Sequence, residues 1–149
     1  MFRKLNASGA ALVEFAMVAP VFFAIMFFVF EFGVIMFIQL NLQQGLDAGV
    51  RLGAVSPATV QSAILQQMQG FADPSLVTVT IQSYSSFAAM NSYNPNTFNP
   101  GTPGTGSEGD VVLYQAKYTY KAITPVVTSF LGSTVVLTAM TVSKNEVPV

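Results

Sequence analysis

The chain has no cysteine and no histidine among its 149 residues. Without cysteine it has neither a disulfide framework nor a thiolate metal site. Without histidine it lacks the commonest general base and metal ligand. Charged residues are also scarce, at 9%, against roughly 25% in soluble domains. The net charge of −1, with no basic cluster, argues against binding to nucleic acid, which requires concentrated lysine and arginine.

What the chain has in excess is apolar side chains, which make up 52% of it and concentrate near the N-terminus. The apolar run 15–38 contains one charged residue, Glu31. As a helix this run would be about 36 Å long, which exceeds the roughly 30 Å hydrocarbon core of a bilayer. Pro20 lies near its start, where the loss of one backbone donor does least harm. The pattern therefore predicts a transmembrane helix over residues 10–42 rather than a buried core helix.

The charges that flank this helix predict its orientation. Arg3 and Lys4 precede it, and the next positive charge is Arg51. The positive-inside rule then places the N-terminus in the cytoplasm and the residues after about 42 on the far side. An ordinary cleaved signal peptide is a poor fit, because its apolar region is about 7–15 residues long and ends in small residues.

Glu14 stands at the head of the apolar run. A carboxylate at the membrane centre costs about 2.5–3.5 kcal/mol, so such a residue usually has a partner. Two interpretations are open. Glu14 reaches water at the cytoplasmic interface, or the chain is cut between Gly9 and Ala10 and Glu14 pairs with the new amino terminus of the same or a neighbouring subunit. In the second case, association of the helices depends on processing.

The sequence GAALVEF at residues 9–15 resembles the processing motif of type IV pilins. In that motif a prepilin peptidase cuts after the glycine and leaves the glutamate as the fifth mature residue. More narrowly, the chain resembles TadE-like minor pilins, or pseudopilins, of the Tad (tight adherence, type IVc) pilus system. The resemblance rests on a short basic leader, this motif, a proline within the apolar helix and an Ala-, Arg- and Gly-rich segment at 46–53. A looser likeness covers residues 118–146.

The resemblance implies a minor pilin, cut between Gly9 and Ala10, that helps to initiate, cap or regulate assembly of a Tad/Flp-type pilus used in adhesion. It assigns Glu14, Phe15 and Pro20 to assembly in the membrane. The implied partners are a prepilin peptidase, other Tad minor pilins, the major pilin, the inner-membrane assembly platform and membrane lipid. The implied location is the bacterial inner membrane, with the C-terminal domain in the periplasm or carried into the extracellular pilus. The alternative is an unprocessed, membrane-anchored structural domain of an envelope or secretion complex.

The rest of the chain predicts a small domain of mixed structure. Ser56 and Pro57 are typical of a helix start, and Gly70 of a helix end. Alternating apolar and polar residues predict three strands, at 76–84, 111–120 and 134–142. A helical turn is expected between the last two strands, at 124–131. We therefore predict an α+β protein, in which a long N-terminal transmembrane helix continues into a small domain of helix plus about three antiparallel strands. The expected division is a leader at 1–9, the transmembrane helix at 10–42 and a periplasmic or extracellular domain at 43–149.

Glycines recur at every fourth position where the helix enters this domain, at Gly45, Gly49 and Gly53. Such a ridge of small residues lets a helix approach another element closely. The sequence favours equally a contact with the protein's own sheet and one with a partner helix.

Residues 91–109 are rich in asparagine, proline and glycine, and predict a long, flexible, exposed loop. Its GTPGTGS portion is expected to form neither helix nor sheet. A spacer is favoured over a partner contact. Glu108 and Asp110 lie in or beside this loop, but they provide too few oxygen ligands for an organised calcium site. No residue pattern marks an activated nucleophile, so the sequence predicts a structural protein without catalytic residues, metal or cofactor.

Overall fold

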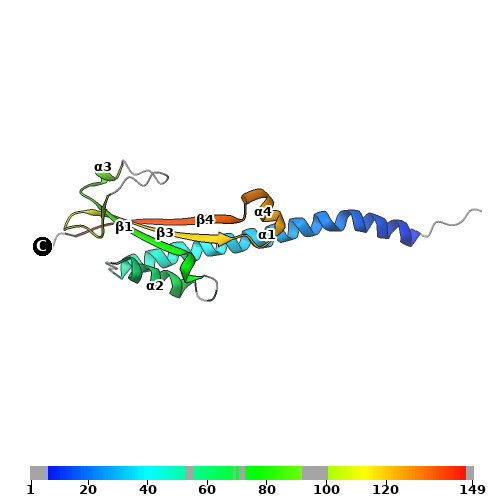
Figure 1. Cartoon of the computed structure of the whole chain (residues 1–149), viewed down its shortest axis with the longest axis horizontal. Coiled ribbons are helices and arrows are strands. Elements are labelled where there is room, and N and C mark those ends of the chain that lie inside the picture. Colours follow the sequence, from blue (N-terminus) through cyan, green and yellow to red (C-terminus); the bar gives the residue numbers. More distant parts are fainter. Residues whose placement is uncertain (1–6, 53–55, 69, 71–72, 92–100, 147–149) are drawn as a thin grey trace, which may run out of the picture.

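One long helix, α1 (Ala7–Arg51), runs through the molecule, and the other elements gather beside its C-terminal half (Figure 1). The computed structural model describes residues 7–52, 56–68, 70, 73–91 and 101–146. The N-terminal half of α1, residues 7–30, projects beyond the sheet and α2, and of the other elements only α4 lies beside it; this projecting half gives the molecule its elongated shape (Figure 1). Pro20 lies within this half, and the helix continues through it.

The folded domain combines short helices with an antiparallel sheet. Its elements are α2 (Pro57–Gln67), a 3-10 turn η1 (Pro74–Leu76), β1 (Val77–Tyr84), α3 (Phe87–Met90), β2 (Thr102–Pro103), β3 (Val111–Lys121), α4 (Pro125–Leu131) and β4 (Thr134–Lys144). The predicted α+β class is confirmed, as are the three longer strands and the helical segment between the last two. The helix that was predicted to start at Ser56 and Pro57 is α2, and the Ser56 side chain accepts a hydrogen bond from the Thr59 backbone N–H.

The sheet has four strands in the order β2-β1-β3-β4, all antiparallel. Its register sets Ile81 opposite Tyr114 and Tyr118 opposite Leu137, so these side chains share the face that packs on the helices. The fourth strand, Thr102–Pro103, lies within the GTPGTGS portion, and the prediction that this portion forms no sheet was wrong. Because β2 is a short edge strand, its proline does not have to donate to a further strand.

Hydrogen bonds tie the segment after β2 to the end of β4. The Asn145 side-chain amide donates to the carbonyls of Thr105 at 2.7 Å and Ser107 at 2.9 Å. The Asp110 carboxylate accepts from the Ser107 N–H at 2.7 Å. Residues 101–109 are therefore held against the domain by contacts that the loop prediction did not include, and residues 92–100 lie outside the described part.

The core forms where the C-terminal half of α1 meets the sheet and α2. Leu42 and Leu46 of α1 are fully buried, as are Val60 and Ile64 of α2. The sheet adds buried side chains from its helix-facing side: Val77, Ile81, Val112, Tyr114, Ala116, Tyr118, Tyr120, Leu137 and Ala139. Helix α1 thus contributes the central element of the domain core as well as the projecting half.

α1 also covers the edge of the sheet at β4. The Gln39 side-chain amide donates to the Thr138 carbonyl at 3.0 Å, and Gln43 reaches the Met140 carbonyl at 3.4 Å. Exposed strand edges are templates for pairing with another chain. The two glutamines occupy carbonyls that an added strand would need.

The regularly spaced glycines of α1 allow close packing against α2. A Cβ atom on Gly45 would lie 2.6 Å from the Cα of Ile64, and one on Gly49 would lie 3.2 Å from the Cα of Val60. The close approach is therefore to a helix of the same chain, which neither sequence interpretation had named. Gly53 lies outside the described residues.

We expect Gly45→Val to destabilise the domain, because the added atoms would collide with the α2 backbone. Overpacking of this kind costs about 1–3 kcal/mol. Gly33→Val is the matched control, since a Cβ on Gly33 meets nothing within 4 Å. Denaturant unfolding of the full chain in detergent, followed by circular dichroism, measures both variants. Equal free energies of unfolding would contradict the packing described here.

Candidate membrane and assembly site

The projecting half of α1 is apolar on every side. Its large side chains are exposed over the whole circumference: Leu12, Val13, Phe15, Met17, Val18, Val21, Phe22, Phe23, Ile25, Phe27, Val29 and Phe30. A helix that is hydrophobic all round needs an apolar environment, either a protein core or a membrane. Residues 9–30 would extend about 33 Å at about 1.5 Å per residue, close to the roughly 30 Å of a bilayer core.

Within the part of the chain that the structure describes, α1 is the one helix long and apolar enough to cross a membrane. Only 17% of its most apolar stretch is buried, whereas the core helix of a soluble protein is mostly buried. The projecting half therefore lacks the protein contacts that would cover a core helix.

The residues that the sequence assigned to processing and assembly all lie on this projecting half. Gly9 and Ala10 are exposed near the start of α1, and a Cβ on Gly9 would meet nothing within 4 Å. Glu14 is exposed one helical turn after Ala10, so the two residues are neighbours on the same face. Phe15 is 66% exposed, and Pro20 is exposed as well.

A second acid of α1, Glu31, is buried at the point where the helix meets the domain. Its side chain is only 4% exposed. One carboxylate oxygen accepts from the Ile123 N–H at 2.5 Å and from the Tyr120 hydroxyl at 3.2 Å. The other accepts from the Thr124 N–H at 2.9 Å and from the Thr124 hydroxyl. The carboxylate thus accepts from four donors, of which the Tyr120 hydroxyl is buried and the other three are partly buried.

This carboxylate fixes the start of α4. Thr124 is the N-cap of α4, and its Oγ1 accepts from the Val127 N–H at 3.3 Å while its hydroxyl proton goes to Glu31. Burial, reinforced by the Glu31 charge, raises the pKa of Tyr120 to about 12. Tyr120 therefore remains protonated, and able to donate, throughout the physiological range.

Sequence reasoning did not assign a role to Glu31. The signal was an acid in the middle of an apolar run, which in a membrane protein usually has a partner. Its partners, however, come 89 to 93 residues later in the chain, from the end of β3 and the start of α4. No local spacing connects them.

Two other acids of the domain, Asp73 and Asp110, accept hydrogen bonds from neighbouring residues of the chain. The Ser75 side chain and backbone N–H bond to Asp73 and hold the pKa of that carboxyl below its usual range. Asp110 closes a turn with Ser107, and Glu108 is exposed. Among the described residues, no group of three acids, histidines or cysteines could hold a metal ion.

Comparison with known families matches residues 9–51 to the TadE-like protein family. The N-terminal helix is thus similar to that of TadE-like proteins. The match begins at Gly9, spans α1 and ends where α1 ends, so it covers both the projecting half and the half that is packed in the domain. No curated protein and no solved structure matched the chain. The resemblance seen in the sequence is thus confirmed for the helix, and it implies a pilin-like protein related to the Tad pilus, a family of generally non-enzymatic structural proteins.

We expect Glu31→Ala to lower the free energy of unfolding by about 1–3 kcal/mol, since it leaves the buried Tyr120 hydroxyl without its acceptor and a buried donor left unsatisfied costs about that much. Glu14→Ala is the matched control, because it removes an exposed acid from the same helix. Denaturant unfolding in detergent compares the two variants, and limited proteolysis reports whether the segment between β3 and β4 has loosened. If both variants unfold like the wild type, Glu31 does not hold α4.

Proposed function

We propose that this TadE-like protein is a minor pilin of a Tad-type pilus, processed by a prepilin peptidase and held in the membrane until assembly. The observation that carries the proposal is the projecting half of α1. It is apolar on all sides and about as long as a bilayer is thick, and the family match begins at Gly9, within its first turn.

The lipid-facing part of the predicted helix 10–42 ends near Glu31 in this proposal. Beyond that point the inward side of α1 is covered by the domain, and Ile35 is 6% and Ile38 3% exposed. Side chains enclosed in this way have no contact with lipid. Residues 10–30 then span the membrane, with Arg3 and Lys4 on the cytoplasmic side and the domain on the periplasmic side.

Processing is supported by the position of Gly9. It lies near the helix end, where tertiary contacts do not hold the backbone in place, and helix ends fray. A peptidase that requires an extended backbone therefore has to unwind only the first turns of α1. The cut creates an amino group at Ala10, one turn from the Glu14 carboxylate.

Assembly then transfers the projecting half from lipid into a bundle of pilin helices, where the same apolar side chains pack against protein. In the bundle, Glu14 pairs with the amino terminus of its own or a neighbouring subunit. The partners in this account are the other Tad minor pilins, the major pilin and the inner-membrane assembly platform. A chain with a folded domain of this size fits a role in initiating, capping or regulating the filament better than the role of bulk subunit.

We expect the mature protein to begin at Ala10 and Gly9→Leu to keep its leader, because a bulky side chain prevents close approach of the backbone to the peptidase. Intact mass of protein isolated from its own cells measures both. Gly33→Leu is the control, since it adds the same bulk far from the cut. A wild-type protein that keeps residues 1–9 in cells with active peptidase would instead support the unprocessed, membrane-anchored alternative.

We expect Glu14→Gln to insert in the membrane as well as the wild type, since a neutral amide is cheaper to desolvate than a carboxylate. Its association with partner pilins should fall. Removing one member of a dry charge pair costs about 3–5 kcal/mol, whereas loss of a water-exposed pair costs about 0–1 kcal/mol. Co-purification with partner pilins measures the difference. Unchanged association and piliation would show that Glu14 is an interfacial acid that reaches water.

A further inference from the structure

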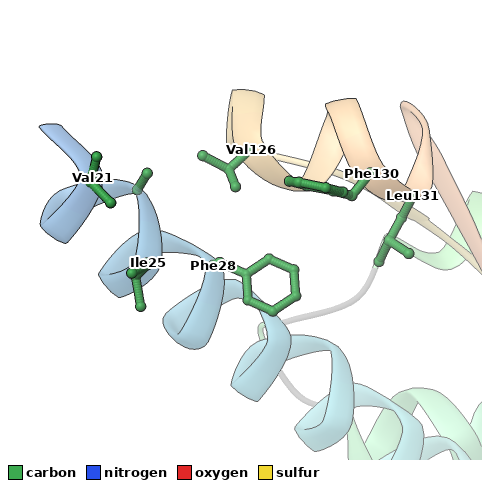
Figure 2. Close-up of a pocket in the computed structure, with 7 residues that line it drawn as sticks. Val21, Ile25, Phe28, Val126, Phe130 and Leu131 are labelled. Atoms are coloured by element: carbon green, nitrogen blue, oxygen red, sulfur yellow. The ribbon is translucent and has the colours of Figure 1, made fainter.

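An apolar groove of about 490 Å³ lies between α4 and the projecting half of α1 (Figure 2). All the residues that line it are apolar: Val21, Ala24, Ile25 and Phe28 from α1, and Val126, Phe130 and Leu131 from α4. In Figure 2 the side chains of Val126 and Leu131 point toward α1, and Phe28 points from α1 into the space between the helices. The groove therefore joins the apolar surface of the projecting half.

The segment that carries α4 exposes large apolar side chains. Phe130 is 79%, Ile123 77% and Leu131 50% exposed. No charged residue occurs between Lys121 and Lys144. Such exposure is costly in water, because each large apolar side chain left uncovered loses about 1.5–3 kcal/mol of burial energy.

Both side-chain hydroxyls of α4 and part of its backbone are hydrogen-bonded within the segment itself. The Thr128 and Ser129 hydroxyls donate to the carbonyls of Thr124 and Pro125, at 3.0 and 2.8 Å. The Gly132 N–H bonds to the Thr128 carbonyl at 3.1 Å, and the Ala122 N–H bonds to the Ser133 carbonyl at 3.0 Å. In hydrocarbon every backbone polar group must find such an internal partner. The Glu31 carboxylate completes this arrangement at the start of α4.

The α1 residues beside α4 lie on the membrane side of Glu31. Val21 is about 15 Å from Glu31 along the helix axis, at about 1.5 Å per residue. Since the proposed span is 10–30, the α1 wall of the groove lies wholly within that span. Because α4 packs alongside this wall, α4 lies at the same depth in the membrane.

We propose that α4 lies within the outer half of the bilayer and that lipid acyl chains fill the groove between α4 and α1. The protein then enters the membrane at two places, a spanning helix and a short helix that dips in from the periplasmic side. This inference rests on the proposed membrane span of residues 10–30.

The charges near α4 agree with this depth. Lys121 is the last residue of β3, is exposed, and lies close enough to Asp73 to lower the pKa of that carboxyl. It marks the level at which the chain leaves the charged part of the domain and enters the uncharged segment. Lysine at this position suits the lipid headgroups, because its amine reaches water and phosphate while its stem lies along apolar surface.

Tryptophan fluorescence measures this depth directly, because the chain contains no tryptophan of its own. Phe130→Trp places one reporter on α4, and its exposure leaves room for the larger ring. Phe23→Trp reports on the span, and Phe87→Trp reports on α3 in the domain, where the side chain is 58% exposed. Each full-length variant is placed in phosphatidylcholine nanodiscs, with discs in excess over protein, with and without lipids brominated in their acyl chains.

We expect bromine to quench Phe130→Trp as it quenches Phe23→Trp, with blue-shifted emission from both, and to leave Phe87→Trp unquenched. Quenching of Phe23→Trp alone would overturn the proposal for α4 and leave the span intact. No quenching of either variant would overturn the span and the proposal together. Blue-shifted emission from Phe130→Trp without quenching would also overturn the proposal, because protein, such as a second copy of the chain, would then cover α4.

Discussion

The packing of the C-terminal half of α1 against the sheet and α2 is the contact on which the rest of the structure depends. Leu42 and Leu46 are fully buried there, and burial of one such side chain contributes about 1.5–3 kcal/mol. The three main strands form a sheet whose apolar face needs a cover, and α1 and α2 provide it. Since α1 is continuous, this contact also fixes the direction in which its projecting half leaves the domain (Figure 1).

Glu31 stands where the two halves of α1 meet. Its carboxylate replaces water as the acceptor for the groups that start α4, so the acid is tolerated in an apolar helix and the segment between β3 and β4 is held close to α1. The Glu31 side chain therefore contacts the domain on one side of α1, whereas most residues of α1 before it are exposed. Glu14 has the opposite surroundings, since it is exposed at the far end of the same helix.

The edge of the sheet and the projecting helix offer different opportunities for assembly. Gln39 and Gln43 occupy carbonyls of β4, and β2 is a two-residue strand that contains a proline. Both edges are thereby poor templates for strand addition. The large apolar surface of the projecting half remains uncovered, which agrees with association of subunits through helices.

The sequence by itself determined the elements that depend on local patterns. Length and composition predicted the apolar helix, alternation predicted the three long strands, the Ser56-Pro57 pair predicted the start of α2, and a helical turn was expected at 124–131, where α4 lies. The tertiary structure decided the features that depend on contacts between distant residues. It brought Glu31 to Thr124, Gly45 to α2 and Thr102 to β1, and it covered one side of the apolar run beyond Glu31 while leaving the part before Glu31 largely exposed. The reason is that lipid and a protein core select the same apolar side chains, so the sequence of α1 does not show which of them the domain will cover.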